Sequence, residues 1–193
     1  RKGDFNIEFN RSLLSSERNK IRIRIEDSLG NTATKKMVVY YTAKNKWPLP
    51  YSINWDTVQD IQDVVQVLDG KWKITPAGIK ILEPYYDRTL AFGDESWNNY
   101  EVKVEVTFHS YTKPYMGAPN YNVTHAGIAS RWPGFDADNF CPYRKWYPLG
   151  ATCEFRLFEN MDSCCFRILG GDDIFNQTPQ ITHLVKMGEK YFL

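Results

Sequence analysis

The chain has 193 residues, of which 42% are hydrophobic and 24% charged, a composition that is typical of a globular protein and excludes a disordered one. Its 24 Lys and Arg residues nearly balance its 23 Asp and Glu residues, so the sequence predicts no general attraction to nucleic acid and no nucleic-acid partner. No stretch reaches the ~18 apolar residues of a membrane span, and the aromatic content of 15% favours an aromatic-rich β-protein.

The two ends of the chain differ from ordinary protein termini. It begins Arg1-Lys2-Gly3-Asp4, with no initiator Met and no signal segment, and it ends in the apolar run Tyr191-Phe192-Leu193. Natural termini are usually polar and loosely held. We therefore expect a piece of a longer polypeptide; the alternative is a signal-cleaved protein with an apolar C-terminal strand.

The first 42 residues predict three strands. Apolar and polar residues alternate over residues 5–9 and 20–25, and residues 37–41 form another β-rich run. Asp27 to Asn31 predicts the turn between the last two strands. Three strands cannot bury both faces of a sandwich. We therefore expect residues 1–42 to pack with strands from outside this chain or from a neighbouring subunit.

The pattern of residues 19–31, Asn-Lys-Ile-Arg-Ile-Arg-Ile-Glu-Asp-Ser-Leu-Gly-Asn, closes in Val38-Val39-Tyr40-Tyr41. It resembles the last strands of bacterial immunoglobulin-like modules. The resemblance implies that residues 1–42 are a partial module of this kind, which usually serves as a spacer in a long surface protein.

Residues 43–56 contain two prolines and no alternation, which predicts a linker. Residues 59–68 predict a short helix or an edge strand, because their apolar residues fit helical spacing. Strands are then predicted at residues 72–74, 78–82, 89–92, 100–108, 126–132, 153–158, 164–169 and 181–186. So many strands, with no amphipathic helix of ordinary length after residue 70, favour a β-sandwich.

A second resemblance covers roughly residues 55–193. Trp72-Lys73-Ile74, the run Asp87 to Asp94, Trp97 to Val102, Gly127 to Trp132 and Trp146 to Ala151 resemble segments of the concanavalin A-like, laminin-G-like jelly roll of bacterial extracellular proteins. The resemblance implies an all-β fold with this jelly roll over residues 57–193, incomplete at its C-terminal end because further strands would follow. It also implies an extracellular or cell-surface location.

The jelly-roll family includes glucanases, which need a nucleophile and an acid/base carboxylate about 5–5.5 Å apart. The nearest run here is Glu101-Val102-Lys103-Val104-Glu105, whose two Glu residues share a face. Lys103 lies between them and no third acid follows, so we interpret the run as a solvated strand face. No metalloprotease, Cys-x-x-Cys or nucleophile-elbow motif occurs. The sequence predicts no catalytic residues, and a glycoside hydrolase remains the enzymatic alternative.

The four cysteines lie within 25 residues: Cys141, Cys153, Cys164 and Cys165. In an extracellular β-protein they predict disulfides. A bond between the neighbours Cys164 and Cys165 would be strained, so we expect Cys141 or Cys153 to bond to one of that pair. Free buried thiols in a cytosolic protein are the alternative.

The loop from residue 131 to 151 is the candidate ligand site. Its aromatic rings and guanidinium groups suit the apolar faces and hydroxyls of sugars, and its prolines stiffen it. The residues expected to bind are Arg131, Trp132, Tyr143, Arg144, Trp146 and Tyr147. The alternative is that these rings cover an edge of the sandwich.

The same loop contains a candidate set of metal ligands, and Asp27 and the pair Asp172-Asp173 are similar but barer candidates. Asp136, Asp138 and Asn139 offer the oxygen atoms that Ca²⁺ prefers, but the EF-hand spacing is missing. We therefore predict no obligatory cofactor, with Ca²⁺ as the one candidate ion. Short acidic turns of this kind are usually only turns.

Together these features predict a non-enzymatic extracellular module that binds a glycan or a surface protein. The alternative is a structural subunit of a surface layer, sheath or filament, which would self-associate through open β edges.

Overall fold

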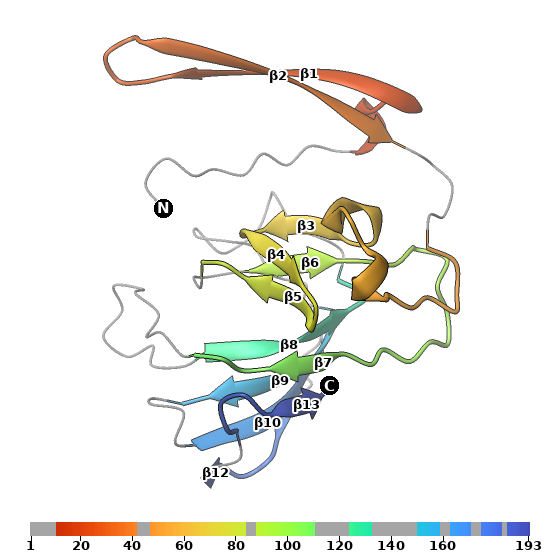
Figure 1. The fold of residues 1–193 in the computed structure, drawn as a ribbon, viewed down its shortest axis with the longest axis vertical. Helices are drawn as coiled ribbons and strands as arrows, with labels where there is room; N and C mark the ends of the chain where they lie inside the picture. The colour runs from red at the N-terminus through yellow and green to blue at the C-terminus, as the bar shows by residue number, and fades with distance from the viewer. Residues whose placement is uncertain are drawn as a thin grey trace. The chain divides into compact units, whose positions relative to one another are not determined.

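The computed structural model describes residues 11–41, 47–83, 88–110, 124–132, 150–158, 163–170, 175–182 and 185–193. In these ranges the regular structure consists of strands and three short 3-10 turns, which confirms the predicted all-β class (Figure 1). The chain divides into two compact units, residues 1–99 and 100–193. The sheets have between two and five strands, so the jelly roll itself stays a prediction, as do the family-based domain limits.

The described part of the N-terminal unit starts with a 3-10 turn, η1 (Arg11–Leu13), followed by a long β-hairpin. Strands β1 (Glu17–Glu26) and β2 (Thr32–Tyr41) pair antiparallel over their whole length, from Glu17 opposite Tyr41 to Glu26 opposite Thr32. The predicted strands at residues 20–25 and 37–41 are thereby confirmed, whereas the strand expected at residues 5–9 lies outside the described residues.

The predicted turn at Asp27 is confirmed in atomic detail. One carboxylate oxygen of Asp27 accepts hydrogen bonds from the backbone N–H groups of Leu29 and Asn31, both at 2.9 Å, and the other accepts from the Asn31 side chain. The Asn31 side-chain bond is the largest of the influences that lower the pKa of Asp27. Gly30 closes the turn with a positive φ of 83°, a conformation that residues with a Cβ rarely adopt.

The rest of the N-terminal unit contains two pairs of short strands. Strand β3 (Gln66–Asp69) pairs with β6 (Thr89–Ala91), and β4 (Trp72–Thr75) pairs with β5 (Gly78–Ile81). The 3-10 turns η2 (Trp55–Thr57) and η3 (Ile61–Asp63) precede β3. The segment 59–68, expected to be a helix or an edge strand, is therefore a 3-10 turn followed by a strand.

Four aromatic rings and one buried ion pair hold residues 47–99 together. Tyr51 lies 6.0 Å from Trp47, 6.1 Å from Trp97 and 6.3 Å from Phe92, measured between ring centres. The Trp97 indole N–H donates to the Trp47 carbonyl at 2.8 Å. Trp47 and Tyr51, which the sequence places in a linker, thus belong to this packed region. Arg88 adds a 2.6 Å ion pair to the buried carboxylate of Asp69.

The C-terminal unit is built on a five-stranded sheet. Its strands are β8 (Thr124–Ser130), β9 (Ala151–Leu157), β10 (Ser163–Leu169), β11 (Phe175–Gln177) and β12 (Ile181–Thr182), in the order β11-β10-β9-β8 with β12 also paired to β10. A separate pair joins β7 (Glu105–Thr107) to β13 (Lys190–Phe192).

Strand β7 is shorter than the predicted strand at residues 100–108, but the predicted two faces are present. Val102, Val104 and Val106 are partly buried, whereas Glu101 and Glu105 are exposed, as expected of a solvated strand face. Hydrogen bonds in both directions between Val104 and Leu193 extend the β7–β13 ladder.

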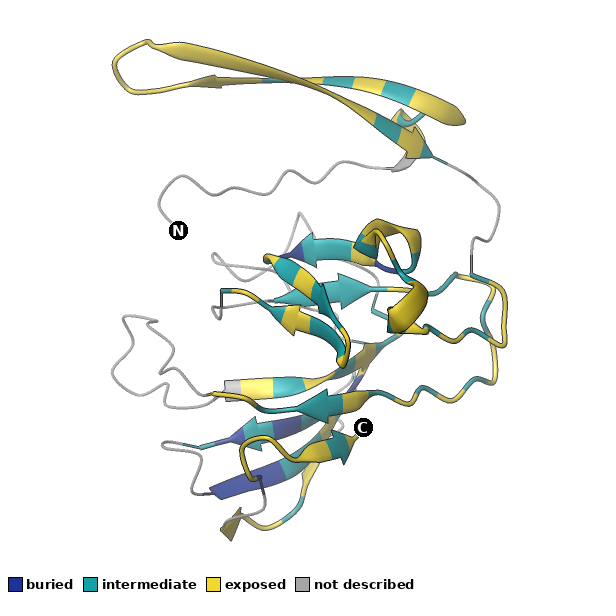
Figure 2. Cartoon of the chain, in the orientation of Figure 1, coloured by how far each residue is buried: buried dark blue, intermediate teal, exposed yellow. Residues whose placement is uncertain are grey.

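The core of the C-terminal unit is formed by side chains on one face of β9 and β10. Figure 2 shows the buried segments of these two strands. The Phe155 ring lies 5.8–6.0 Å from the rings of Phe108, Phe166 and Tyr191. Side chains from β10, from β13 and from the residue that follows β7 therefore meet around β9. Leu157 is 1% exposed beside them. The remaining members of the cluster are Cys164, Val185 and Leu193.

We expect Leu157→Ala to lower the free energy of unfolding by about 2–5 kcal/mol, because truncation leaves a cavity in a closed core. Urea unfolding of the whole chain measures this. The control is Phe192→Ala, whose ring is 72% exposed and whose loss should change stability by less than about 1 kcal/mol. Equal effects from both variants would contradict the placement of the core.

Candidate functional site

The candidate site lies on the polar face of the five-stranded sheet, opposite the core. Successive side chains of a strand point to opposite faces. In β9, Phe155 and Leu157 face the core, so Thr152, Glu154 and Arg156 share the other face. The strand register places Gly127 of β8 and Arg167 of β10 on either side of Glu154.

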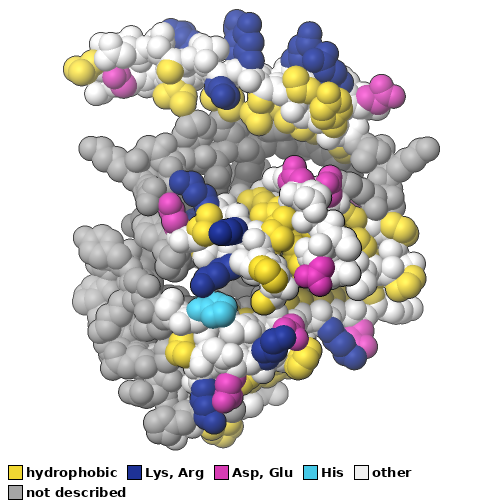
Figure 3. All heavy atoms as spheres, in the orientation of Figure 1, with side chains coloured by type: hydrophobic (Ala, Val, Ile, Leu, Met, Phe, Trp, Pro, Cys, Tyr) yellow, Lys and Arg dark blue, Asp and Glu magenta, His cyan; other side chains and the backbone are white. Residues whose placement is uncertain are grey.

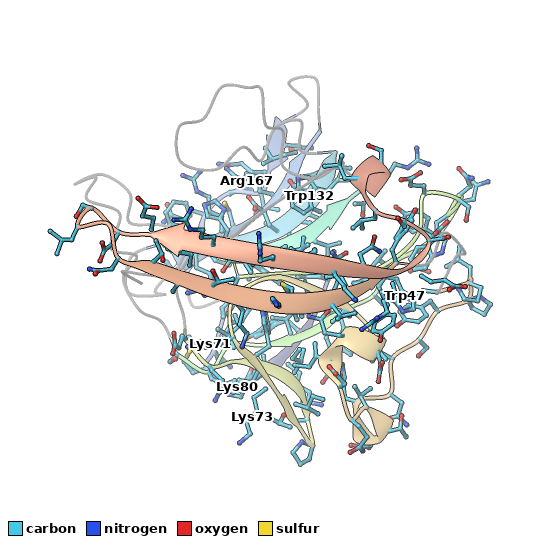
Figure 4. All side chains as sticks on the ribbon, turned by 90° about the horizontal axis from the view of Figure 1, so that it is seen from above. Trp47, Lys71, Lys73, Lys80, Trp132 and Arg167 are labelled. Carbon is cyan, nitrogen blue, oxygen red and sulfur yellow. The ribbon has the colours of Figure 1, made fainter. Side chains whose placement is uncertain are left out.

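Glu154 is the centre of a three-residue network on this face. Its Oε1 accepts a hydrogen bond from Arg167 Nε at 2.5 Å and lies 3.1 Å from His125 Nδ1. A second guanidinium nitrogen of Arg167 completes the ion pair with Glu154 and lies 3.2 Å from His125 Nδ1. The Glu154 and Arg167 side chains are only 14% and 15% exposed, and that of His125 is 31% exposed. Figure 4 labels Arg167 on this sheet.

Burial and charge act in opposite directions on Glu154. Burial is the largest influence and raises the pKa of Glu154, but hydrogen bonds and charges from His125 and Arg167 together outweigh it, so the pKa lies below its ordinary value of 4.5. The carboxylate is therefore ionised at neutral pH, and it holds the Arg167 guanidinium in one orientation.

Gly127 allows β8 to approach this network closely. A Cβ built on Gly127 would lie 2.4 Å from the Cys153 carbonyl oxygen and 2.5 Å from Glu154 Cβ. Side chains cannot tolerate such distances without backbone movement. The absence of a side chain at Gly127 therefore lets the β8 backbone pack directly against Glu154, with His125 two residues away on the same face.

Two further polar atoms on the same face have no hydrogen-bond partner among the described residues. They are the Thr152 hydroxyl and the Arg156 Nε, and both atoms are buried. A buried polar group without a partner costs about 1–3 kcal/mol, and native proteins leave few of them. Thr152 and Arg156 flank Glu154 along β9. The face therefore combines a carboxylate with two hydrogen-bonding partners and two buried polar atoms, the Thr152 hydroxyl and Arg156 Nε, that have none among the described residues.

The loop predicted to bind ligand connects β8 to β9. Arg131, exposed and with a positive φ of 54°, and the partly buried Trp132 follow β8 directly. Ser130 of β8 is paired with Ala151 of β9, which places both ends of the connection at one end of the sheet. The other predicted binding residues, Tyr143, Arg144, Trp146 and Tyr147, lie outside the described residues, as do the proposed calcium ligands Asp136, Asp138 and Asn139 and the cysteine Cys141.

The cysteine prediction needs correction for Cys153. The register places Cys153 opposite Ile168, three and four residues along β10 from Cys165 and Cys164. At ~3.3 Å per residue this separation is about 10–13 Å, too far for a disulfide. All three are free thiols in the structure. Burial is the main cause that raises the pKa values of Cys153 and Cys164. The charge of Glu154 adds to the effect at Cys153, and Cys165 adds to it at Cys164. A raised pKa disfavours the reactive thiolate.

The remaining sequence expectations concern metals, membranes and catalytic carboxylates. The described ranges contain no group of three or more His, Cys, Asp or Glu side chains placed to hold a metal ion. Nor do they contain a helix long and apolar enough to cross a membrane. Glu101 and Glu105 form surface ion pairs with Lys103 and Lys190 at 3.3 and 2.7 Å.

Sequence analysis did not single out His125, Glu154 or Arg167 as a site. Each belongs to a strand with alternating residues, which was a detectable signal, but only the pairing of three strands separated by long connections brings them together. Comparisons with known proteins add no further residue, since no family model, no curated protein and no solved structure matches the chain.

We expect the stability difference between the wild type and Glu154→Gln to depend on pH. Because the folded-state pKa of Glu154 is lowered, its ionised form stabilises the fold fully above its ordinary pKa, and this contribution disappears as the pH falls through the folded-state value. Urea unfolding at several pH values between 7 and 3 should therefore show the two proteins converging in acid. A difference that is constant with pH would contradict the assigned charge state.

Proposed function

We propose that the chain is a non-enzymatic, extracellular binding module, and that the polar face of β8, β9 and β10 contacts a glycan or another surface ligand. The observation that carries the proposal is the pair of unsatisfied buried polar atoms on β9, the Thr152 hydroxyl and Arg156 Nε, beside the ordered Glu154–Arg167–His125 network. A ligand hydroxyl or carboxylate would satisfy both atoms.

The chemistry of the face suits an oligosaccharide. Sugar hydroxyls both donate and accept hydrogen bonds, and the face offers a hydroxyl, a carboxylate and guanidinium groups in fixed positions. Because Glu154 already orders Arg167, little side-chain freedom is lost when a ligand binds. The β8–β9 connection begins at one end of this face with Arg131 and Trp132. The Trp132 indole would add an apolar contact of the kind that sugar rings require.

The first test is Thr152→Val, with Thr107→Val as the matched control. Valine keeps the shape of threonine but removes a hydroxyl that has no partner in the described fold. We expect Thr152→Val to retain or raise the melting temperature and to weaken, by roughly tenfold, binding to the oligosaccharide that the wild type selects from a glycan array. Thr107 lies on β7, next to Phe108, whose ring contacts Phe155 on the core face of β9. Its variant should therefore bind like the wild type.

The proposal fails if the wild type binds no oligosaccharide and no cell-surface protein, or if Thr152→Val binds as tightly as Thr107→Val. Release of reducing sugar ends from the bound oligosaccharide would instead support a glycoside hydrolase.

A second candidate is a structural subunit that assembles through β edges. The observation that favours it is the hairpin of β1 and β2, which pair only with each other in the part of the chain that the structure describes. Both outer edges of this ten-residue ladder are therefore open to further strands. Ordered assemblies seen by electron microscopy without added glycan, and lost in Ile23→Lys but kept in Thr34→Lys, would favour this function.

A further inference from the structure

We infer that the β1–β2 hairpin carries a second binding surface, for a linear anionic polysaccharide, on the face formed by the even-numbered residues of the two strands. The hairpin is a separate element from the polar face of the C-terminal unit, and ligand binding to it does not depend on that site. It rests on the register of the hairpin and on the charges that this register aligns.

The register separates the hairpin into an apolar and a basic face. Ile21 lies opposite Met37 and Asn19 opposite Val39, so the odd-numbered residues form a largely apolar face on which Lys35, opposite Ile23, is the one cation. Arg22 lies opposite Lys36 on the other face. Figure 3 shows most of the Lys and Arg side chains along one side of β1–β2, and hydrophobic side chains with a basic one among them along the other. The cations that share the basic face are Arg18, Lys20, Arg22, Arg24 and Lys36, all exposed.

Acidic side chains neutralise little of this basic face. Glu26 is the one acid on it, and it pairs with Arg24 at 3.1 Å. Asp27 is committed to the hairpin turn, where its carboxylate accepts three hydrogen bonds. Arg18, Lys20, Arg22 and Lys36 have no ion-pair partner among the residues described. Like charges directly opposite each other, such as Arg22 and Lys36, destabilise a free sheet, and an anionic ligand would remove that repulsion.

The spacing of the cations fits a linear polymer. Alternate residues of one strand lie about 7 Å apart, so Arg18, Lys20, Arg22 and Arg24 form a row about 20 Å long, with Lys36 beside its centre. The apolar face keeps this row in register, because a slip of one residue would exchange the two faces. A regular row of this length matches repeated carboxylate or sulfate groups better than a single small anion.

The side chains between the cations favour a polysaccharide over a nucleic acid. Single-stranded nucleic acids are bound by rows of aromatic side chains on which bases stack. The basic face offers one aromatic ring, Tyr40, opposite Arg18 at one end of the row. The near-neutral charge of the whole chain also provides no broad attraction to a phosphate backbone.

The test measures binding of the whole chain to dextran sulfate, a linear sulfated polysaccharide, with neutral dextran for comparison. We expect binding of dextran sulfate that weakens as salt is added, and none of dextran. The double variant Arg22→Gln/Lys36→Gln should bind roughly tenfold more weakly and with a shallower salt dependence. Its melting temperature should be unchanged or higher, because the variant removes a repulsion.

The matched control is Lys73→Gln/Lys80→Gln. Lys73 and Lys80 are also exposed and directly opposite each other, on β4 and β5 (Figure 4), so the control removes the same charge from another hairpin. It should bind like the wild type. Equal weakening by both double variants, or no binding of dextran sulfate by the wild type, would overturn the inference. So would tighter binding of a single- or double-stranded oligonucleotide than of dextran sulfate, which would identify a nucleic-acid surface instead.

Discussion

The alternation of side chains along β9 is the constraint on which the C-terminal unit depends. β9 lies between β8 and β10, so both of its edges are paired. Phe155 and Leu157 point into the aromatic core, and this forces Thr152, Glu154 and Arg156 onto the opposite face. A shift of one residue in the pairing would bury the charged residues in the core and expose the aromatic ones. Core packing therefore positions the polar face as well.

The polar face combines interactions that contribute unequally to stability. In the buried Glu154–Arg167 pair, charge attraction and hydrogen bonding offset the free-energy cost of removing both groups from water. Such a balance adds, on average, little net stability. Thr152 and Arg156 add buried atoms without partners among the described residues. A purely structural sheet would gain from apolar side chains at these positions. The arrangement is easier to understand as preparation for a ligand, since preformed polar groups bind at a smaller entropic cost.

Different interactions hold the N-terminal unit together. Residues 47–99 are held by the rings of Trp47, Tyr51, Phe92 and Trp97 and by the Asp69–Arg88 ion pair. The β1–β2 hairpin has no buried residue in its strands (Figure 2). Isolated two-stranded hairpins are at best marginally stable in water, so contacts on the apolar face of this one are expected to contribute to its order.

The sequence by itself determined the all-β class, the strands of the first hairpin and the Asp27 turn. These features depend on alternation and on hydrogen bonds between residues at most five apart, such as those that join Asp27 to Asn31. It also correctly predicted that Glu101 and Glu105 are exposed, because the faces of one strand follow from its own period of two. To predict the basic face of the hairpin, one must also know the pairing register of β1 and β2 across their short turn.

Only the tertiary structure decided which residues meet across the five-stranded sheet. His125, Glu154 and Arg167 are 29 and 13 residues apart along the chain, and neither separation reveals the pairing of β8, β9 and β10. The same register excludes the expected disulfide from Cys153, because Ile168, rather than a cysteine, lies opposite it. Alternation shows to which side of a strand a residue points. Which residue lies opposite it on the next strand depends on how the long loops between the strands bring those strands together. That arrangement depends on the burial of the whole sheet, which no local pattern encodes.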